Sequence, residues 1–207
     1  MIKPYYQDEW CTIYNNDYRD VLPELEPVDL VLTDPPYGLN KLMAGGTWGT
    51  AHKHGDMLKW DYVLKQSDFD KLLEIDAIKI IWGANNYIIP PSRCWLVWLK
   101  PQIPTLSDIE MAWTNIDAPA KCYKHNRVSP NKGHPTEKPL NLMIFCINKS
   151  KTEGVILDPF MGSGTTLVAG KQLGRKAIGI EIEKKYCDIA IERLRQDPLP
   201  LVFNKTT

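Results

Sequence analysis

The sequence predicts an α/β fold, in which a mostly parallel sheet is covered by helices on both faces. Short apolar runs alternate along the chain with segments whose apolar residues recur at helical spacing. This alternation is typical of parallel strands joined by helices. Acidic residues also stand at or just beyond the ends of several apolar runs. Open α/β sheets bind ligands at the carboxyl ends of their strands, so these acidic residues are candidates for a site.

The apolar runs predict seven strands, each short enough to cross a sheet once. They lie at residues 10–15, 28–34, 77–82, 94–99, 109–114, 154–158 and 176–181. Four tryptophans fall on these strands and are expected in the core: Trp82, Trp95, Trp98 and Trp113.

Five helices are expected, at residues 17–25, 68–76, 139–149, 164–173 and 183–195. The third begins at Pro139, which suits the first turn of a helix. Its apolar residues share one face, at Leu140, Met143, Ile144 and Ile147. The fourth is followed by Gly174, a residue type that commonly ends a helix.

A proline-rich corner, Asp34-Pro35-Pro36-Tyr37, follows the second expected strand. Proline cannot continue a central strand, and a residue before proline is restricted to extended geometry, so Asp34 is expected at a rigid strand tip. The corner would present a carboxylate, a backbone carbonyl and an aromatic ring. Together these suit a planar base that carries an exocyclic amine. The alternative interpretation is an ordinary Pro-Pro turn with a surface tyrosine.

A second motif, residues 155–166, predicts a strand, a glycine turn and the start of a helix. Its glycines allow a ligand to approach the backbone, and a helix N-terminus favours an anionic group. The next strand ends at Glu181, where folds of this type hold ribose hydroxyls. Leu167 stands where a dinucleotide fingerprint needs a third glycine, which disfavours NAD. Asp158 suits a ligand with an ammonium group and a positively charged sulfur.

With these motifs, Asp17 and the segment from His134 to Pro139, the chain resembles the DNA amino-methyltransferases that use S-adenosylmethionine. It is similar to the small prokaryotic or phage members in which the DPPY motif precedes the cofactor glycine motif, the β group. The resemblance implies a Rossmann-like sheet of seven strands with one antiparallel strand, in a single domain over residues 1–207. It implies catalysis by Asp34, Pro35, Pro36 and Tyr37. It implies cofactor binding by Asp17, Thr136, Lys138, Asp158, Phe160, Gly162, Ser163, Gly164, Thr165, Thr166 and Glu181.

The implied reaction is site-specific methyl transfer from S-adenosylmethionine to N6 of a flipped adenine in DNA, as in restriction-modification. The Asp34 carboxylate and the Pro35 carbonyl would accept the hydrogens of the amine. Cytosine N4 presents the same geometry and stays the alternative, although the leading Asp goes mainly with adenine in this family. A methyltransferase for RNA or protein glutamine is disfavoured by the motif order, and a non-catalytic binding module by the intact acidic residues.

The net charge of the chain limits how it can bind DNA. The 207 residues carry no net charge, so contact with DNA must come from local basic clusters. Residues 39–59, with Lys53, are expected to form a mobile flap, and residues 117–133 a short target-recognition insertion. The DNA-contacting candidates there are Lys121, Lys124, Arg127 and Lys132. We expect a duplex DNA substrate, a monomer or homodimer, no metal, no membrane span and a cytoplasmic location in a prokaryotic or phage-infected cell.

Overall fold

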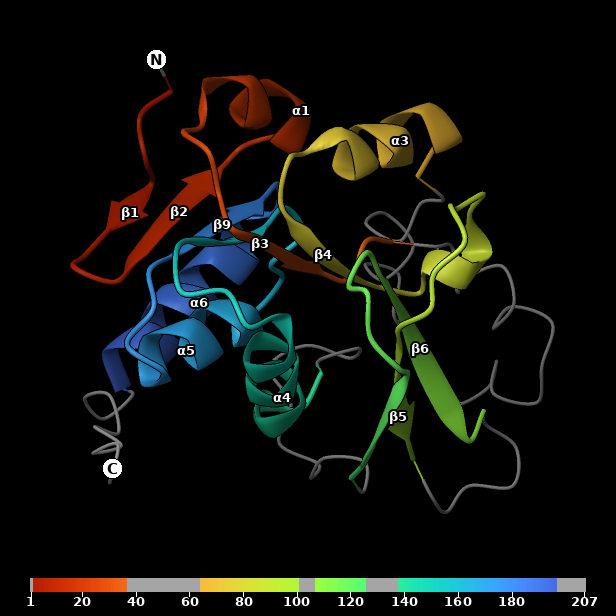
Figure 1. Ribbon diagram of the computed structural model, residues 1–207. Coiled ribbons are helices and arrows are strands. Elements are labelled where there is room, and N and C mark those ends of the chain that lie inside the picture. The colour runs from red at the N-terminus through yellow and green to blue at the C-terminus, as the bar shows by residue number, and fades with distance from the viewer. Residues whose placement is uncertain (1, 37–63, 101–106, 126–137, 197–207) are drawn as a thin grey trace, which may run out of the picture.

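A computed structural model describes residues 2–36, 64–100, 107–125 and 138–196 (Figure 1). In this part of the chain the strands are β1 (Tyr6–Gln7), β2 (Cys11–Asn15), β3 (Leu30–Thr33), β4 (Ile78–Trp82), β5 (Trp95–Leu99), β6 (Ile109–Thr114), β7 (Lys121–Lys124), β8 (Ile156–Asp158) and β9 (Ala177–Glu181). The helices are α1 (Tyr18–Val21), α3 (Gln66–Glu74), α4 (Leu140–Ser150), α5 (Thr165–Gln172) and α6 (Lys184–Gln196). Two 3-10 turns are η1 (Leu22–Glu24) and η2 (Ala84–Asn86).

The strands form one sheet in the order β1-β2-β9-β8-β3-β4-β6-β5-β7. The seven predicted strands are its central block, and β6 is the antiparallel strand within that block. The sheet has two more strands than expected, because β1 and β7 extend its edges in the described residues. β1 has two residues and runs antiparallel to β2, so it gives no sequence pattern. β7 is a charged and largely exposed edge strand, as edges commonly are.

The first predicted helix is wrong in its extent. Residues 17–25 form the short helix α1 and then the 3-10 turn η1. Pro23 explains the change, because it has no backbone N–H with which to continue an α-helix. The other helices begin and end within two residues of the predicted bounds.

Two hydrophobic cores hold the sheet between its helices. On one face, α4, α5 and α6 pack through residues such as Leu142, Leu167 and Ala190. On the other, α1 and α3 pack through residues such as Tyr18 and Phe69. Figure 1 shows these two sets of helices on opposite sides of the sheet. Each large apolar side chain buried in this way contributes roughly 1.5–3 kcal/mol.

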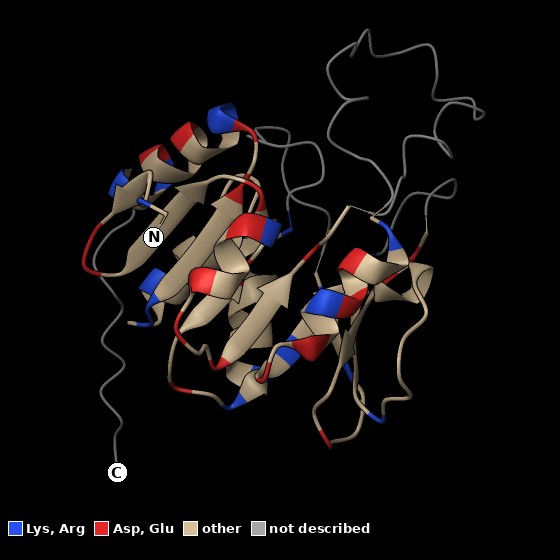
Figure 2. Cartoon of the chain, turned by 90° about the horizontal axis from the view of Figure 1, so that it is seen from above, with Lys and Arg blue, Asp and Glu red and all other residues tan. Residues whose placement is uncertain are grey.

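Three of the four strand tryptophans are buried, as predicted, and Trp95 is partly buried. Lysine, arginine and acidic residues are interspersed over the helices and connecting segments, while the central strands are mostly uncharged (Figure 2). Within the described ranges, no helix has the length and hydropathy needed to cross a membrane.

Candidate active site

The carboxyl ends of the central parallel strands bring the predicted acidic residues to one edge of the sheet. Asp34 follows β3, Asp158 ends β8 and Glu181 ends β9. β2 lies beside β9 with Asn15 opposite Glu181, so Asp17 stands two residues beyond that pair. Strand order therefore joins the proline corner, which is early in the sequence, to the glycine motif, which is late.

Side chains from two other parts of the chain contact the corner after β3, and a third side chain stacks on one of them. Lys138, directly before α4, places its Nζ 2.5 Å from Oδ2 of Asp34. The Tyr87 hydroxyl donates to the Pro36 carbonyl at 2.5 Å, and the Tyr87 ring stacks on Phe69 with centroids 4.1 Å apart. No described residue donates to the Pro35 carbonyl. The corner thus has one anchored carbonyl and one available as an acceptor; the next residue, Tyr37, lies outside the described residues.

Asp158 joins the two motif strands from inside the protein. Its side chain is buried, and Oδ1 accepts from the Thr33 hydroxyl at 2.7 Å and from the Phe160 N–H at 3.1 Å. Burial raises the pKa of Asp158 to about 6, although hydrogen bonds from Thr166, Thr33 and the Phe160 backbone oppose that shift. Asp158 therefore links β8 to β3 by a hydrogen bond between side chains. Its contact with a cofactor ammonium stays a prediction.

Glu181 fastens the glycine turn to the end of β9. Its Oε2 accepts from the Gly162 N–H at 3.1 Å, and its Oε1 accepts from the Glu183 N–H at 2.8 Å. Burial raises the pKa of Glu181 to about 7, against these two backbone hydrogen bonds. The Asn15 side-chain amide donates to the carbonyls of Glu181 and Ile182 at 3.0 Å each. These hydrogen bonds attach the end of β9 to the glycine turn on one side and to the end of β2 on the other.

The glycine turn packs tightly against α6. Gly164 has φ +79°, and a Cβ there would lie 2.7 Å from the Ala190 Cβ, so only glycine fits. Arg193 donates to the Ser163 carbonyl at 2.8 Å, to the Ser163 hydroxyl at 2.9 Å and to the Thr165 hydroxyl at 3.2 Å. The Ser163, Thr165 and Thr166 side chains are all buried. These buried side chains pack beneath the glycine turn and help to fix its conformation.

Phe160, in the turn after β8, and Asp17, after β2, both contact residues of α1. The Phe160 ring contacts Tyr18 with centroids 4.7 Å apart. Asp17 caps α1 by accepting from the Arg19 N–H at 2.9 Å, and it pairs with the Arg19 guanidinium at 2.5 Å. The hydrogen bond from Arg19 lowers the pKa of Asp17. The Asn16 N–H donates to the Glu181 carbonyl at 3.2 Å, which keeps Asp17 near the end of β9.

Lys138, one of the predicted cofactor residues, lies close to Asp34. It contacts the proline corner and lies among Asp34, Glu110 and the ring of Trp82. Thr136, the other candidate of that motif, lies outside the described residues.

Sequence reasoning missed several residues that hold the site, among them Thr33, Tyr87, Glu110 and Arg193. Only Glu110 left a signal, as the one acid in the otherwise uncharged strand β6.

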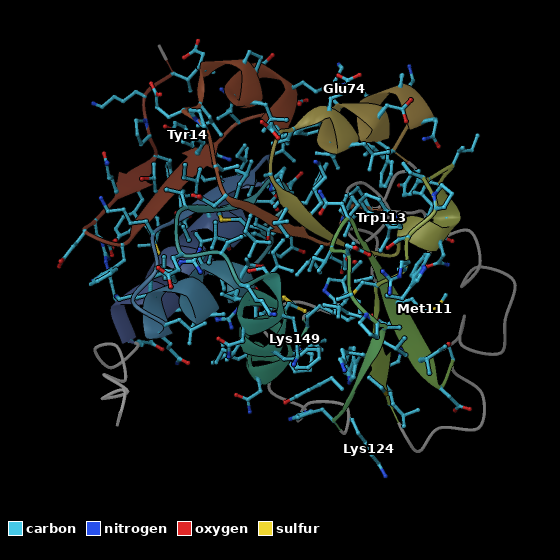
Figure 3. The ribbon with its side chains drawn as sticks, in the orientation of Figure 1. Tyr14, Glu74, Met111, Trp113, Lys124 and Lys149 are labelled. Atoms are coloured by element: carbon cyan, nitrogen blue, oxygen red, sulfur yellow. The ribbon has the colours of Figure 1, made fainter. Side chains whose placement is uncertain are left out.

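The predicted DNA contacts are described only in part. Lys121 and Lys124 lie on the edge strand β7, where both are exposed. Figure 3 shows the Lys124 side chain pointing away from the sheet. Lys53, Arg127 and Lys132, with the segment 39–59, lie outside the described residues. In the described ranges, no group of three His, Cys, Asp or Glu side chains is placed to hold a metal ion.

Residues 65–192 match the model of a family described as DNA methylase. The chain belongs to the DNA methylase family. The type II methyltransferase M2.DpnII of Streptococcus pneumoniae is 54% identical to it, over 95% of this chain and 94% of that protein. This alignment runs over 260 positions, whereas the chain has 207 residues. The relative therefore has at least 53 residues with no counterpart here.

Solved structures agree with this family. The crystal structure of an M1.HpyAVI–SAM complex matches with a TM-score of 0.58 and 25% identity, over 89% of this chain and 98% of that one. The PvuII DNA methyltransferase, titled cytosine-N4-specific, shares the fold with a TM-score of 0.57 and 16% identity, over 96% of this chain and 98% of that one. This DNA methylase thus has the Rossmann-like methyltransferase fold, in which the proline corner precedes the glycine motif.

Proposed function

We propose that this DNA methylase transfers a methyl group from S-adenosylmethionine to N6 of adenine at specific DNA sites. The observation that carries the proposal is the hydrogen bond of 2.7 Å from Thr33 to Asp158. It joins the strand before the proline corner to the strand before the glycine turn. A base held at Asp34 and a cofactor held at the glycine turn would therefore meet at one edge of the sheet.

Asp34 and Pro35 would activate the amine. The lone pair of an aromatic amine is delocalised into its ring, which makes the nitrogen a poor nucleophile. Two acceptors on its hydrogens, the Asp34 carboxylate and the Pro35 carbonyl, draw the nitrogen toward tetrahedral geometry and stabilise the positive charge that develops. The anchored Pro36 carbonyl supports this assignment, because Tyr87 keeps the corner rigid. Tyr37 would stack on the base after it leaves the duplex.

The glycine turn and Glu181 would hold the cofactor. S-adenosylmethionine, when bound, supplies a methyl group on a positively charged sulfur. The Glu181 carboxylate keeps acceptor capacity for ribose hydroxyls beyond its two backbone hydrogen bonds. Ile182, next in the chain, is 59% exposed and offers an apolar surface for a ring. Asp17, Asp158 and Phe160 complete the proposed cofactor residues around the glycine turn, with Thr136 and Lys138 assigned there by resemblance.

The base is proposed from Asp34, since the fold itself accommodates either base. Incubation with labelled S-adenosylmethionine and duplex DNA, followed by nucleoside analysis, should yield N6-methyladenine. N4-methylcytosine in its place would establish the alternative. Label found only in RNA or in protein glutamine would overturn the DNA assignment, and no label in any substrate would favour a binding module.

We assign DNA contact to Lys121 and Lys124 on β7, together with Lys53, Arg127 and Lys132. The segments 39–59 and 117–133 keep their proposed roles as flap and recognition segment within one domain. We also propose that the substrate is duplex DNA with the target base flipped out, and that the protein is a monomer or homodimer. Its proposed role is restriction-modification in the cytoplasm, like that of a bacterial type II methyltransferase.

A further inference from the structure

Four charged side chains form a continuous chain of contacts that ends at Asp34. Lys138 Nζ lies 2.5 Å from Asp34 Oδ2 and 3.1 Å from Glu110 Oε2. Lys100 Nζ lies 2.6 Å from the other Glu110 oxygen, Oε1. Lys138 is 8% exposed and Lys100 is 9% exposed, so these contacts are far better shielded from water than a surface ion pair.

The topology explains how these side chains meet. Asp34 follows β3 and Glu110 lies near the start of β6, while β4 runs between those two strands in the sheet. β6 is antiparallel to β4, so its first residues lie at the edge where the parallel strands end. Lys138 reaches this edge from the segment before α4, and its Nζ lies 5.7 Å from the ring centre of Trp82 at the end of β4. Lys138 therefore spans from β3 to β6.

The charges matter for the reaction. The target nitrogen becomes positive as the methyl group arrives, and an ammonium beside Asp34 opposes this because like charges repel. An anion on the far side of Lys138 cancels much of that repulsion. Burial opposes ionisation of Glu110, but Lys138 and Lys100 outweigh it and lower the pKa of Glu110 to about 2. Glu110 is therefore a carboxylate at neutral pH.

We propose that Glu110 is a positioning residue for methyl transfer: it holds Lys138 against Asp34 and balances the ammonium charge, so that Asp34 keeps its orientation and its attraction for the reacting amine. The inference rests on the proposed role of Asp34. It assigns to the reaction a residue on β6, a strand that carries neither the proline corner nor the glycine motif. Lys100 supports the arrangement from outside by holding the second oxygen of Glu110.

The test compares Glu110→Gln with Glu110→Asp under single-turnover conditions. Gln keeps the length of the side chain but loses its charge, whereas Asp keeps the charge but is shorter. We expect Glu110→Gln to slow methyl transfer by roughly 10- to 100-fold, since it removes a charged hydrogen-bond partner. Affinity for S-adenosylmethionine, measured by calorimetry, should stay within about twofold because Glu110 does not contact the glycine turn. Glu110→Asp should retain more activity than Glu110→Gln.

Two controls separate the possible causes. Lys71→Met removes an exposed cation that pairs with Asp68 on α3 at 3.3 Å, and it should leave the rate unchanged. Asp34→Ala should be inactive; if it is active, the proposed role of Asp34 fails, whatever Glu110 does. If Asp34→Ala is inactive and folded Glu110→Gln keeps the wild-type rate, the inference about Glu110 alone is overturned.

A purely structural role gives a different pattern. Gln, the better match in shape, would then be milder than Asp, and that order would contradict the proposal. A loss of cofactor affinity that accounts for the whole loss of rate would also contradict it. If thermal unfolding shows that Glu110→Gln does not fold, Glu110→Ala carries the test, because it also removes the carboxylate: a slower transfer with unchanged cofactor affinity supports the proposal, and an unchanged rate refutes it.

Discussion

Replacing Thr33 by Val tests the connection between the two motif strands. Thr33 and Asp158 are both buried, and the Thr33 hydroxyl donates to Asp158 Oδ1 at 2.7 Å. Val has nearly the same shape, so the change removes the donor without opening a cavity. A hydrogen bond to a charged group is worth about 1.5–3 kcal/mol, and we expect that loss of unfolding free energy when Asp158 is ionised. For a chain of this size, each kcal/mol lowers the melting temperature by roughly 2–4 °C.

The size of the loss should depend on pH. Burial raises the folded pKa of Asp158 to about 6, above the ordinary value of an aspartate. A raised pKa contributes stability that is fully present below the unfolded pKa and is lost as pH rises through the folded pKa. The folded protein therefore holds Asp158 neutral at pH 5 and charged at pH 8. Because Thr33 stabilises the charged form most, the effect of Thr33→Val should be larger at pH 8 than at pH 5.

Urea unfolding of both proteins at pH 5 and pH 8 measures this difference. Thr33→Ser, which keeps the hydroxyl, should retain most of the pH 8 stability and serves as the matched control. Equal losses for Thr33→Val at the two pH values would show that Asp158 does not titrate as argued. No loss at either pH would show that the hydrogen bond contributes nothing to stability.

Three further predictions concern the ligands. Asp34→Ala should abolish methyl transfer while calorimetry finds cofactor affinity within a few-fold; a matching loss of cofactor affinity would reassign the residue. Because burial raises the pKa of Glu181 to about 7, affinity for S-adenosylmethionine should rise from pH 6 to pH 8 as the acceptor ionises, and Glu181→Gln should remove that rise. A pH profile shared by wild type and variant would exclude this assignment. The third change replaces four basic residues by Ala: Lys121, Lys124, Arg127 and Lys132. Each side chain lost that binds a DNA phosphate should reduce the slope of log affinity for DNA against log salt by about 1. An unchanged slope would show that DNA binds elsewhere than on these four residues.

Much of the fold could be predicted because its signals are local. The buried strands β3, β4 and β9 are apolar runs, and α4 and α6 have apolar residues on one face, so both types of element follow from spacing. β7 could not be predicted, because Lys121 and Lys124 on an exposed edge strand give no apolar pattern. The helix predicted over residues 17–25 was too long, because Pro23 ends regular α-helical hydrogen bonding after α1.

The sequence by itself determined which chemical groups this protein carries and at which strand ends they stand. Two prolines force a corner after Asp34, and Gly164 permits a backbone conformation that side chains rarely adopt; both are properties of single residues. Only the tertiary structure decided which partners those groups meet. Lys138 contacts Asp34 from 104 residues away, and Thr33 contacts Asp158 from 125 residues away. Such pairs depend on the order of strands in the sheet. That order is a property of the whole packed core, and no local pattern in the residues between the two partners indicates it.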